Sequence, residues 1–126
     1  MDRNGFAAWL ADYVTAWRSN DGKAIGALFS EHARYHYGPY SEPVVGREAI
    51  VASWLTNPDD PASWQASYRP LAVDGDTFVA TGESTYFEPG GTAVRTAYSN
   101  IFVCRFDEKG LCLEFREWFM ERPKAS

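Results

Sequence analysis

The sequence contains few cysteines and no long apolar run, and both absences restrict what the protein can be. Cys104 and Cys112 are its only cysteines. They fall on neighbouring predicted strands and on opposite faces, so we expect two reduced thiols and no disulfide, as in a cytoplasmic protein. No apolar run is long enough to cross a bilayer, and the first residues lead into an amphipathic helix that does not resemble a signal peptide. We therefore expect a cytoplasmic protein that does not associate with membranes.

Runs of basic residues and common catalytic motifs are also absent. The 126 residues carry a net charge of -5, which argues against nucleic acid and anionic membrane surfaces as partners. Gly90 and Gly91 fall in a predicted hairpin, where they cannot form a phosphate-binding loop, and no Gly-x-Ser-x-Gly elbow is present. His32 and His36 are four residues apart but flank a predicted helix-to-strand junction, with no third ligand nearby. We expect neither a metal nor a cofactor.

Aromatic residues, in contrast, are abundant. They make up 16% of a chain that is 45% hydrophobic. Such a surplus is typical of an aromatic-lined cavity, an oligomer interface, or both, although aromatic rings also dominate ordinary cores. Residues 1–126 are enough for one domain that encloses a core without disulfides.

Apolar spacing predicts three helices in the first half of the chain. The first is amphipathic and ends near residue 20. Asp21 can cap a second, shorter helix, and a third is predicted over 47–55. Residues 34–37 read as a short strand, followed by a loop over 38–46. The apolar residues that recur every three or four positions in the first helix are Phe6, Leu10, Tyr13 and Trp17.

After a proline-bounded break at residues 57–61, the pattern is that of strands throughout. Turn signals at 74–76, 88–91 and 107–110 would join these strands into an antiparallel meander. Helices followed by strands indicate an α+β fold, with helices covering one face of a curved, mostly antiparallel sheet. The four predicted strands span 64–73, 77–87, 96–106 and 111–120.

The last hairpin carries the most informative feature for function. With a four-residue loop at 107–110, Phe102 would pair with Phe115, and Asn100 with Glu117. One face of the sheet is then apolar near the turn and bears an amide beside an acid further along. A carboxylate on such a face must be paired or have a raised pKa, and groups of this kind are often functional. The alternative interpretation is a glutamate at the sheet rim, in contact with water or in a salt bridge.

Extending the same register through the preceding hairpin adds further groups. Glu83 would pair with Thr96 and share a face with Glu117, but too far away to form a close carboxylate pair. We therefore expect Glu83 at the rim or in an interface. Tyr68 and Tyr98 would lie on the Glu117 face, where a phenol could donate a hydrogen bond to a carbonyl, or simply pack.

The element order, Pro39, the helix start at 46–50 and the closing segment 106–119 together resemble the nuclear transport factor 2-like superfamily. Within it, the chain is similar to the SnoaL-like branch of polyketide-cyclase-like proteins, over essentially its whole length. The resemblance implies a cone in which a bent sheet wraps around the long first helix. It also implies a small-molecule pocket inside the cone and, commonly, a homodimer through the outer sheet face. Members include ketosteroid isomerases, polyketide cyclases, limonene epoxide hydrolases, dehydratases and non-catalytic binders, so the resemblance implies a fold more strongly than an activity.

In cyclases of this branch, an acid on the final strand transfers a proton at a carbon next to a carbonyl. The resemblance assigns that position to Glu117. The cyclases' partner histidine has no counterpart here, and Asn100 is the nearest polar group. The residue patterns of the isomerases and of the epoxide hydrolases are not matched.

We therefore predict a protein that binds a hydrophobic or aromatic small molecule, possessing the groups for isomerisation, cyclisation, dehydration or hydration without a cofactor. The catalytic candidates are Glu117 as general acid or base, Asn100 and Tyr98. A non-catalytic ligand-binding or dimeric interaction module is the alternative, and a structural dimer with a filled cone is a third. The predicted ligand-binding residues are Tyr13, Trp17, Tyr35, Trp54, Tyr68, Phe102 and Phe115.

Overall fold

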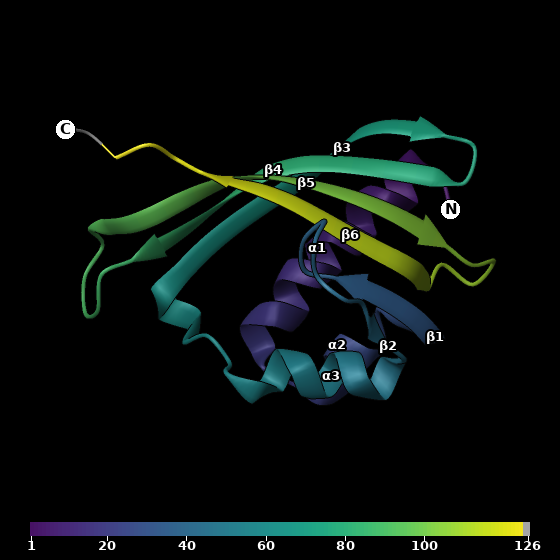
Figure 1. Cartoon of the computed structure of the whole chain (residues 1–126), viewed down its shortest axis with the longest axis horizontal. Coiled ribbons are helices and arrows are strands. Elements are labelled where there is room, and N and C mark those ends of the chain that lie inside the picture. Colours follow the sequence, from purple (N-terminus) through teal and green to yellow (C-terminus); the bar gives the residue numbers. More distant parts are fainter. Residues whose placement is uncertain (125–126) are drawn as a thin grey trace.

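The computed structural model describes residues 1–124, in which a curved six-stranded sheet arches over three helices (Figure 1). The strand order across the sheet is β2-β1-β6-β5-β4-β3. The helices are α1 (Arg3–Ser19), α2 (Gly22–Gly26) and α3 (Arg47–Thr56), with a 3-10 turn η1 (Pro61–Ser63). The strands are β1 (Phe29–His36), β2 (Val44–Val45), β3 (Trp64–Asp74), β4 (Thr77–Phe87), β5 (Val94–Phe106) and β6 (Cys112–Glu121).

The ends of the first two helices follow from local chemistry. The Asp2 side chain caps α1 by accepting a hydrogen bond from the Gly5 amide at 2.7 Å. Helix α1 ends where Asn20 adopts a left-handed conformation, with φ 52°. Asp21 then caps α2 by accepting from the Lys23 amide at 3.0 Å, as the sequence predicts.

The predicted meander of β3 to β6 is confirmed, and one parallel pair closes the sheet on its other side. Strand β1 lies parallel to β6, with Tyr35 opposite Phe115. This pairing brings the first half of the chain against the last strand, which local pattern does not reveal. The two-residue strand β2 lies inside the segment predicted as a loop and pairs with β1.

The pairing of β5 with β6 differs from the predicted register by two residues. Phe102 lies opposite Glu117, in the place where the pattern predicts Phe115, and Asn100 lies opposite Phe119. Beyond the bulge near the turn, a shift of two residues keeps the side chains of β6 on their predicted face, because faces alternate with a period of two. Asn100 and Glu117 therefore still share the inner face of the sheet, which is the face toward the helices.

Two separate one-residue shifts produce this register. At the turn, the Asp107 amide donates to the Leu111 carbonyl, which makes the loop one residue shorter than predicted. A bulge between Arg105 and Phe106 then introduces the second shift. Each shift alone would have turned the Glu117 side chain to the outer face.

The predicted register of β4 with β5 is wrong by an odd number. Glu83 pairs with Ser99, three positions from the predicted Thr96, because the turn is longer and a bulge follows it. Glu83 consequently lies on the outer face, where its carboxylate is exposed and 3.2 Å from the Arg69 guanidinium. It does not share a face with Glu117, although its exposure fits the expected rim position.

The predicted separation of the two cysteines on opposite faces is also wrong. The β5–β6 bulge turns Cys112 to the inner face, and both Cys104 and Cys112 are free and fully buried in the core. Burial raises the pKa of the Cys104 thiol well above its ordinary value, and the neighbouring Cys112 thiol raises it further.

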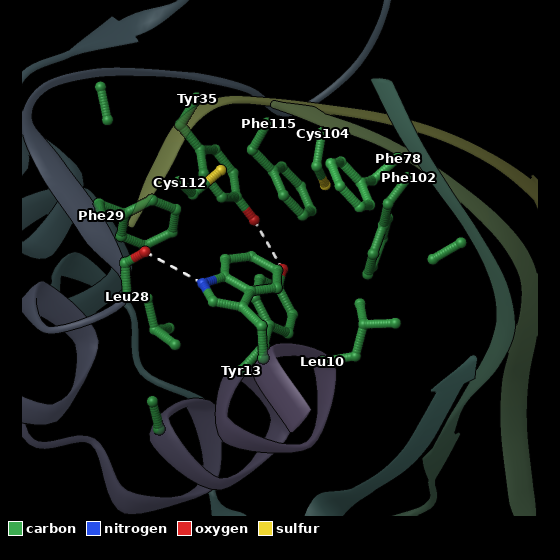
Figure 2. Packing of buried hydrophobic residues seen from close by; sticks show 14 of the residues in the cluster. Leu10, Tyr13, Leu28, Phe29, Tyr35, Phe78, Phe102, Cys104, Cys112 and Phe115 are labelled. Carbon is green, nitrogen blue, oxygen red and sulfur yellow. Dashed lines mark hydrogen bonds between the residues drawn. The ribbon is translucent and has the colours of Figure 1, made fainter. Parts of the chain in front are cut away.

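The core lies between α1 and the inner face of the sheet, and aromatic rings dominate it (Figure 2). Tyr13 reaches up from α1, and Tyr35 and Phe115 reach down from the sheet (Figure 2). The Phe115 ring stacks on the Tyr35 ring at 4.5 Å between centroids, and on the Tyr13 ring at 5.3 Å. Within residues 1–124, no helix is long and apolar enough to span a membrane.

Candidate functional site

A cavity of about 530 Å³ lies between the helices and the inner face of the sheet. Its size is within the range of small-molecule sites, roughly 300–1,000 Å³. The interior of the cone is therefore not filled by side chains. Residues from α1, α2, α3, β1, β3, β4, β6 and the adjoining loops contribute to its wall: Tyr13, Trp17, Asn20, Ile25, Tyr35, Tyr37, Ser53, Trp54, Thr56, Asn57, Asp59, Tyr68, Ser84, Tyr86 and Glu117.

Glu117 on β6 is the acid at the sheet side of this cavity. Burial among apolar and aromatic groups raises the pKa of its carboxyl from 4.5 to about 7, while the hydrogen bond from Asn100 lowers it. No basic group contributes to this pKa. The carboxyl is therefore close to half ionised at neutral pH, the state in which one group can either accept or donate a proton.

A short hydrogen-bonded chain orients the amide beside Glu117. The Ser84 hydroxyl donates to Asn100 Oδ1 at 3.0 Å, and Asn100 Nδ2 donates to Glu117 Oε2 at 2.8 Å. Ser84 and Asn100 are both buried. Because Ser84 occupies the amide oxygen, the Asn100 nitrogen is the atom that faces the acid, and it favours the ionised form of Glu117.

Tyrosine hydroxyls supply the remaining polar groups of the wall. Tyr13 and Tyr35 share a hydrogen bond of 2.7 Å between their hydroxyl oxygens, drawn as a dashed line in Figure 2. Burial raises the pKa of both phenols well above the ordinary value, and the Glu117 charge raises each further. One proton lies in the shared bond, so the second phenol proton is available to an acceptor in the cavity.

Tyr68 on β3 extends this wall. Burial raises the pKa of its phenol, the Glu117 charge also raises it, and the Ser84 hydroxyl partly offsets both as a hydrogen-bond partner. Its ring lies against Gly82, where a Cβ atom would meet Tyr68 Cδ1 at 2.6 Å. Glycine at this strand position therefore makes room for the Tyr68 ring.

Tyr98, a predicted catalytic residue, lines a second cavity of about 640 Å³ instead of the first. The two cavities share Tyr37, Ser84, Tyr86 and Glu117, so they adjoin at the acid. Asn100 also lines the second cavity. Glu117 thus lines both cavities.

The predicted pocket residues divide into a lining and a supporting layer. Phe102 and Phe115 do not line either cavity, because both are fully buried behind the tyrosines. Phe102 packs on Tyr68 at 4.4 Å between ring centroids. The structure brings the other five to the cavity wall: Tyr13, Trp17, Tyr35, Trp54 and Tyr68.

The histidines lie outside the cavity. His36 Nε2 is 3.1 Å from Glu114 Oε2, which also accepts from Arg116 at 3.3 Å. Burial opposes ionisation of Glu114, but these two partners outweigh it and lower the pKa of its carboxyl. Across residues 1–124, no group of three or more His, Cys, Asp or Glu side chains is arranged to hold a metal ion.

Several lining residues were not among the sequence-based candidates. Ser84 and Tyr86 lie on the inner face because of the register between β4 and β5. A bulge sets this register, and the local sequence pattern does not predict the bulge. Asp59 lies in the proline-bounded break before η1, where its Oδ2 accepts from Trp17 Nε1 at 3.1 Å. The sequence does contain one indication for Asp59: it is an acid between two prolines, close to the end of a predicted helix.

Comparison with known proteins agrees with this architecture. A candidate ketosteroid isomerase from Kribbella flavida superposes with a TM-score of 0.72 and 21% identity, covering 99% of this chain and 84% of that one. An NTF-2-like protein of unknown function from Burkholderia xenovorans superposes with a TM-score of 0.71 and 16% identity, covering 98% of this chain and 88% of that one. An NTF2-like protein with a cystatin-like fold from Novosphingobium aromaticivorans superposes with a TM-score of 0.67 and 22% identity, covering 92% of this chain and 80% of that one.

At these identities the solved structures establish the fold alone. No curated protein matches the sequence. The family model of the SnoaL-like domain, in contrast, matches residues 10–115, which span most of the chain and include all three helices in part or whole. The chain therefore belongs to the SnoaL-like domain family, within the NTF2-like superfamily.

Proposed function

We propose that the protein binds a hydrophobic or aromatic small molecule in the cavity of the cone and transfers a proton on it without a cofactor. Isomerisation, cyclisation and dehydration all require proton removal next to a polarised carbonyl or hydroxyl. The observation that carries the proposal is a single one: the Glu117 carboxyl lies on the cavity wall with its pKa raised to about 7. A base or acid with a pKa near the working pH is the most effective proton-transfer group.

The neighbouring groups support this role. Asn100 Nδ2 donates to Glu117 Oε2 at 2.8 Å, which restricts the orientation of the carboxyl group on the cavity wall. The Tyr13–Tyr35 pair and Tyr68 remain protonated because burial raises the pKa of each phenol. A phenol aimed at a carbonyl oxygen stabilises the enolate that forms when the adjacent carbon loses its proton. Tyr68 and this pair suit the role better than Tyr98, which lines the second cavity.

Proton transfer at carbon can be detected before the natural substrate is known. The protein is incubated in D₂O with a panel of hydrophobic and aromatic ketones, and deuterium at the α-carbon is measured by mass spectrometry. We expect at least one ketone to exchange faster with the wild type than with Glu117→Gln, by about 10²–10⁴-fold. Because the base must be ionised, the rate should rise with pH and level off above about 7.

Glu83→Gln is the matched control, since it removes an exposed carboxylate on the outer face. Its exchange rates should equal those of the wild type. The competing function is a non-catalytic ligand-binding module. Ketones that raise the melting temperature of the wild type but never exchange, or that exchange equally with Glu117→Gln, would establish binding without catalysis and overturn the proposal.

A further inference from the structure

The charged groups on the wall of the 530 Å³ cavity all have the same sign. Asp59 and Glu117 are acids, and among the described residues that line this cavity none is basic. Neither carboxylate has a salt-bridge partner within residues 1–124. The cavity therefore presents uncompensated negative charge to whatever enters it.

Two arginines lie near this wall without lining it. Arg18 donates to the Pro61 carbonyl at 2.6 Å, and its guanidinium carbon lies 4.2 Å from the centroid of the Trp64 ring. Arg95 lines the second cavity, with its guanidinium carbon 5.7 Å from the Tyr86 ring centroid. An anionic ligand in the first cavity would thus meet two carboxylates and no basic residue among the side chains that line it.

Aromatic rings form much of the same wall. The faces of tyrosine and tryptophan rings carry negative potential and attract cations, most strongly where water is excluded. Burial and the charges of Asp59 and Glu117 raise the pKa of the Tyr86 phenol to about 12, against the Arg95 charge, which lowers it, so both acids act at this ring. The rings that line the cavity are Tyr13, Trp17, Tyr35, Tyr37, Trp54, Tyr68 and Tyr86.

Asp59 is held in place at the helix side of the cavity. Its Oδ2 accepts from the indole nitrogen of Trp17 at 3.1 Å, and its backbone carbonyl accepts from Asn20 Nδ2 at 3.1 Å. No residue of the described chain donates a hydrogen bond to Oδ1. This leaves a fixed carboxylate with one oxygen free, beside the ring of Trp17 and acting on the ring of Tyr86.

We infer that the cavity selects an aromatic amine in its ammonium form, with the ammonium group against Asp59 and the rings of Trp17 and Tyr86, and the aromatic body extending toward Glu117. This inference rests on the proposed function as a small-molecule site and names its ligand class. The ammonium group satisfies the free oxygen of Asp59, and Glu117 remains available for chemistry on the body of the ligand.

The test uses three probes with one aromatic skeleton and three head-group charges: 2-naphthylmethylammonium, 2-naphthylmethanol and 2-naphthoate. Binding to the whole protein is measured at pH 8 by isothermal titration calorimetry. We expect the ammonium probe to bind about tenfold more tightly than the alcohol, the size of a desolvated cation–π contact and an ion pair together. The naphthoate should bind most weakly.

Asp59→Asn keeps an oxygen for the Trp17 hydrogen bond but removes the charge. It should lower the affinity for the ammonium probe about fivefold to tenfold and leave the affinity for the alcohol unchanged. Asp12→Asn is the matched control, because it removes one negative charge, as Asp59→Asn does, but from an exposed position on α1 outside the cavity. It should change neither affinity.

The remaining outcomes separate the inference from the function on which it rests. Equal affinity for the ammonium and the alcohol, or tightest binding of the naphthoate, would overturn the selection for cations while leaving a small-molecule site in place. Failure of all three probes to bind would overturn the inference and count against the proposed function as well. If Asp59→Asn and Asp12→Asn weaken binding of the ammonium probe equally, the cause is the net charge of the protein and not a local ion pair with Asp59. That result would also overturn the inference.

Discussion

Glu117 is the residue that gives the cavity its chemical character. It is an acid on an aromatic wall, its only strong partner is the amide of Asn100, and no cation lowers its pKa. The protein carries a free-energy cost for keeping this carboxylate buried, because the folded state disfavours its ionised form. Such a cost is typical of residues retained for function rather than for stability.

That cost should be visible as a dependence of stability on pH. Below the ordinary pKa of 4.5, Glu117 is protonated in both the folded and the unfolded states and costs nothing. Between 4.5 and about 7, the unfolded state ionises first, so the stability contributed by the folded state's extra proton is lost as pH rises. Above about 7 the loss is complete, at about 3 kcal/mol.

Glu117→Gln removes this dependence. We expect it to match the wild type near pH 4 and to exceed its free energy of unfolding by about 3 kcal/mol at pH 8, measured by urea denaturation. Glu83→Gln, as a control, removes only an exposed ion pair and should change stability by less than about 1 kcal/mol. A constant difference between wild type and Glu117→Gln across this pH range would contradict a raised pKa.

At the scale of elements, the packing of β3 on β4 positions the tyrosine wall. Gly82 is the point of closest approach, since a Cβ atom there would meet the Tyr68 side chain and the Ser67 carbonyl oxygen. We expect Gly82→Ala to lower the free energy of unfolding by about 1–3 kcal/mol through overpacking. It should also lower the affinity for any ligand that binds in the cavity, because the Tyr68 ring must move.

Gly91→Ala is the matched control for this substitution. Gly91 is in the exposed β4–β5 turn, where the nearest neighbour of an added Cβ is the Ala93 amide nitrogen at 3.9 Å. It should change stability by less than about 0.5 kcal/mol. If Gly82→Ala is as stable as Gly91→Ala, the close contact with Tyr68 does not constrain the sheet.

The elements themselves could be predicted from the sequence far better than their pairing. Helix ends depend on caps such as Asp21 and on apolar spacing, both of which are local. The register of β4 against β5 depends on a bulge beside the turn and on contacts across the sheet, which are not local. Ser84 and Tyr86 were therefore missed, whereas Glu117 was identified because two one-residue shifts restored its face.

At the scale of the whole molecule, the outer face of the sheet remains exposed and partly apolar. Ile101 lies opposite Trp118 on β5 and β6, Trp118 is 40% exposed, and Met120 beyond it is 75% exposed. We propose that this face packs against the same face of a second copy, as the family resemblance leads us to expect. Isologous contacts of this kind close a dimer with twofold symmetry.

Trp118→Glu tests this proposal. We expect the wild type to have the mass of a dimer, and the variant that of a monomer, in size-exclusion chromatography with light scattering. Circular dichroism should show the same fold for both. Leu71→Glu, which changes an even more exposed apolar residue on the edge strand β3, should leave the dimer intact. A monomeric wild type at about 100 μM, a concentration far above a nanomolar Kd, would contradict the dimer.

The proposed chemistry depends on one property of the molecule, which is that the Glu117 carboxyl group titrates near neutral pH. Its titration can be followed directly by ¹³C NMR of protein labelled at the glutamate carboxyl carbons, with Glu117→Gln to assign the signal. We expect an inflection near pH 7, moving upward in Asn100→Ala, because the amide hydrogen bond lowers the pKa. An inflection near the ordinary value of 4.5 would mean that Glu117 is hydrated as a surface acid, and the proton-transfer function would have to be abandoned.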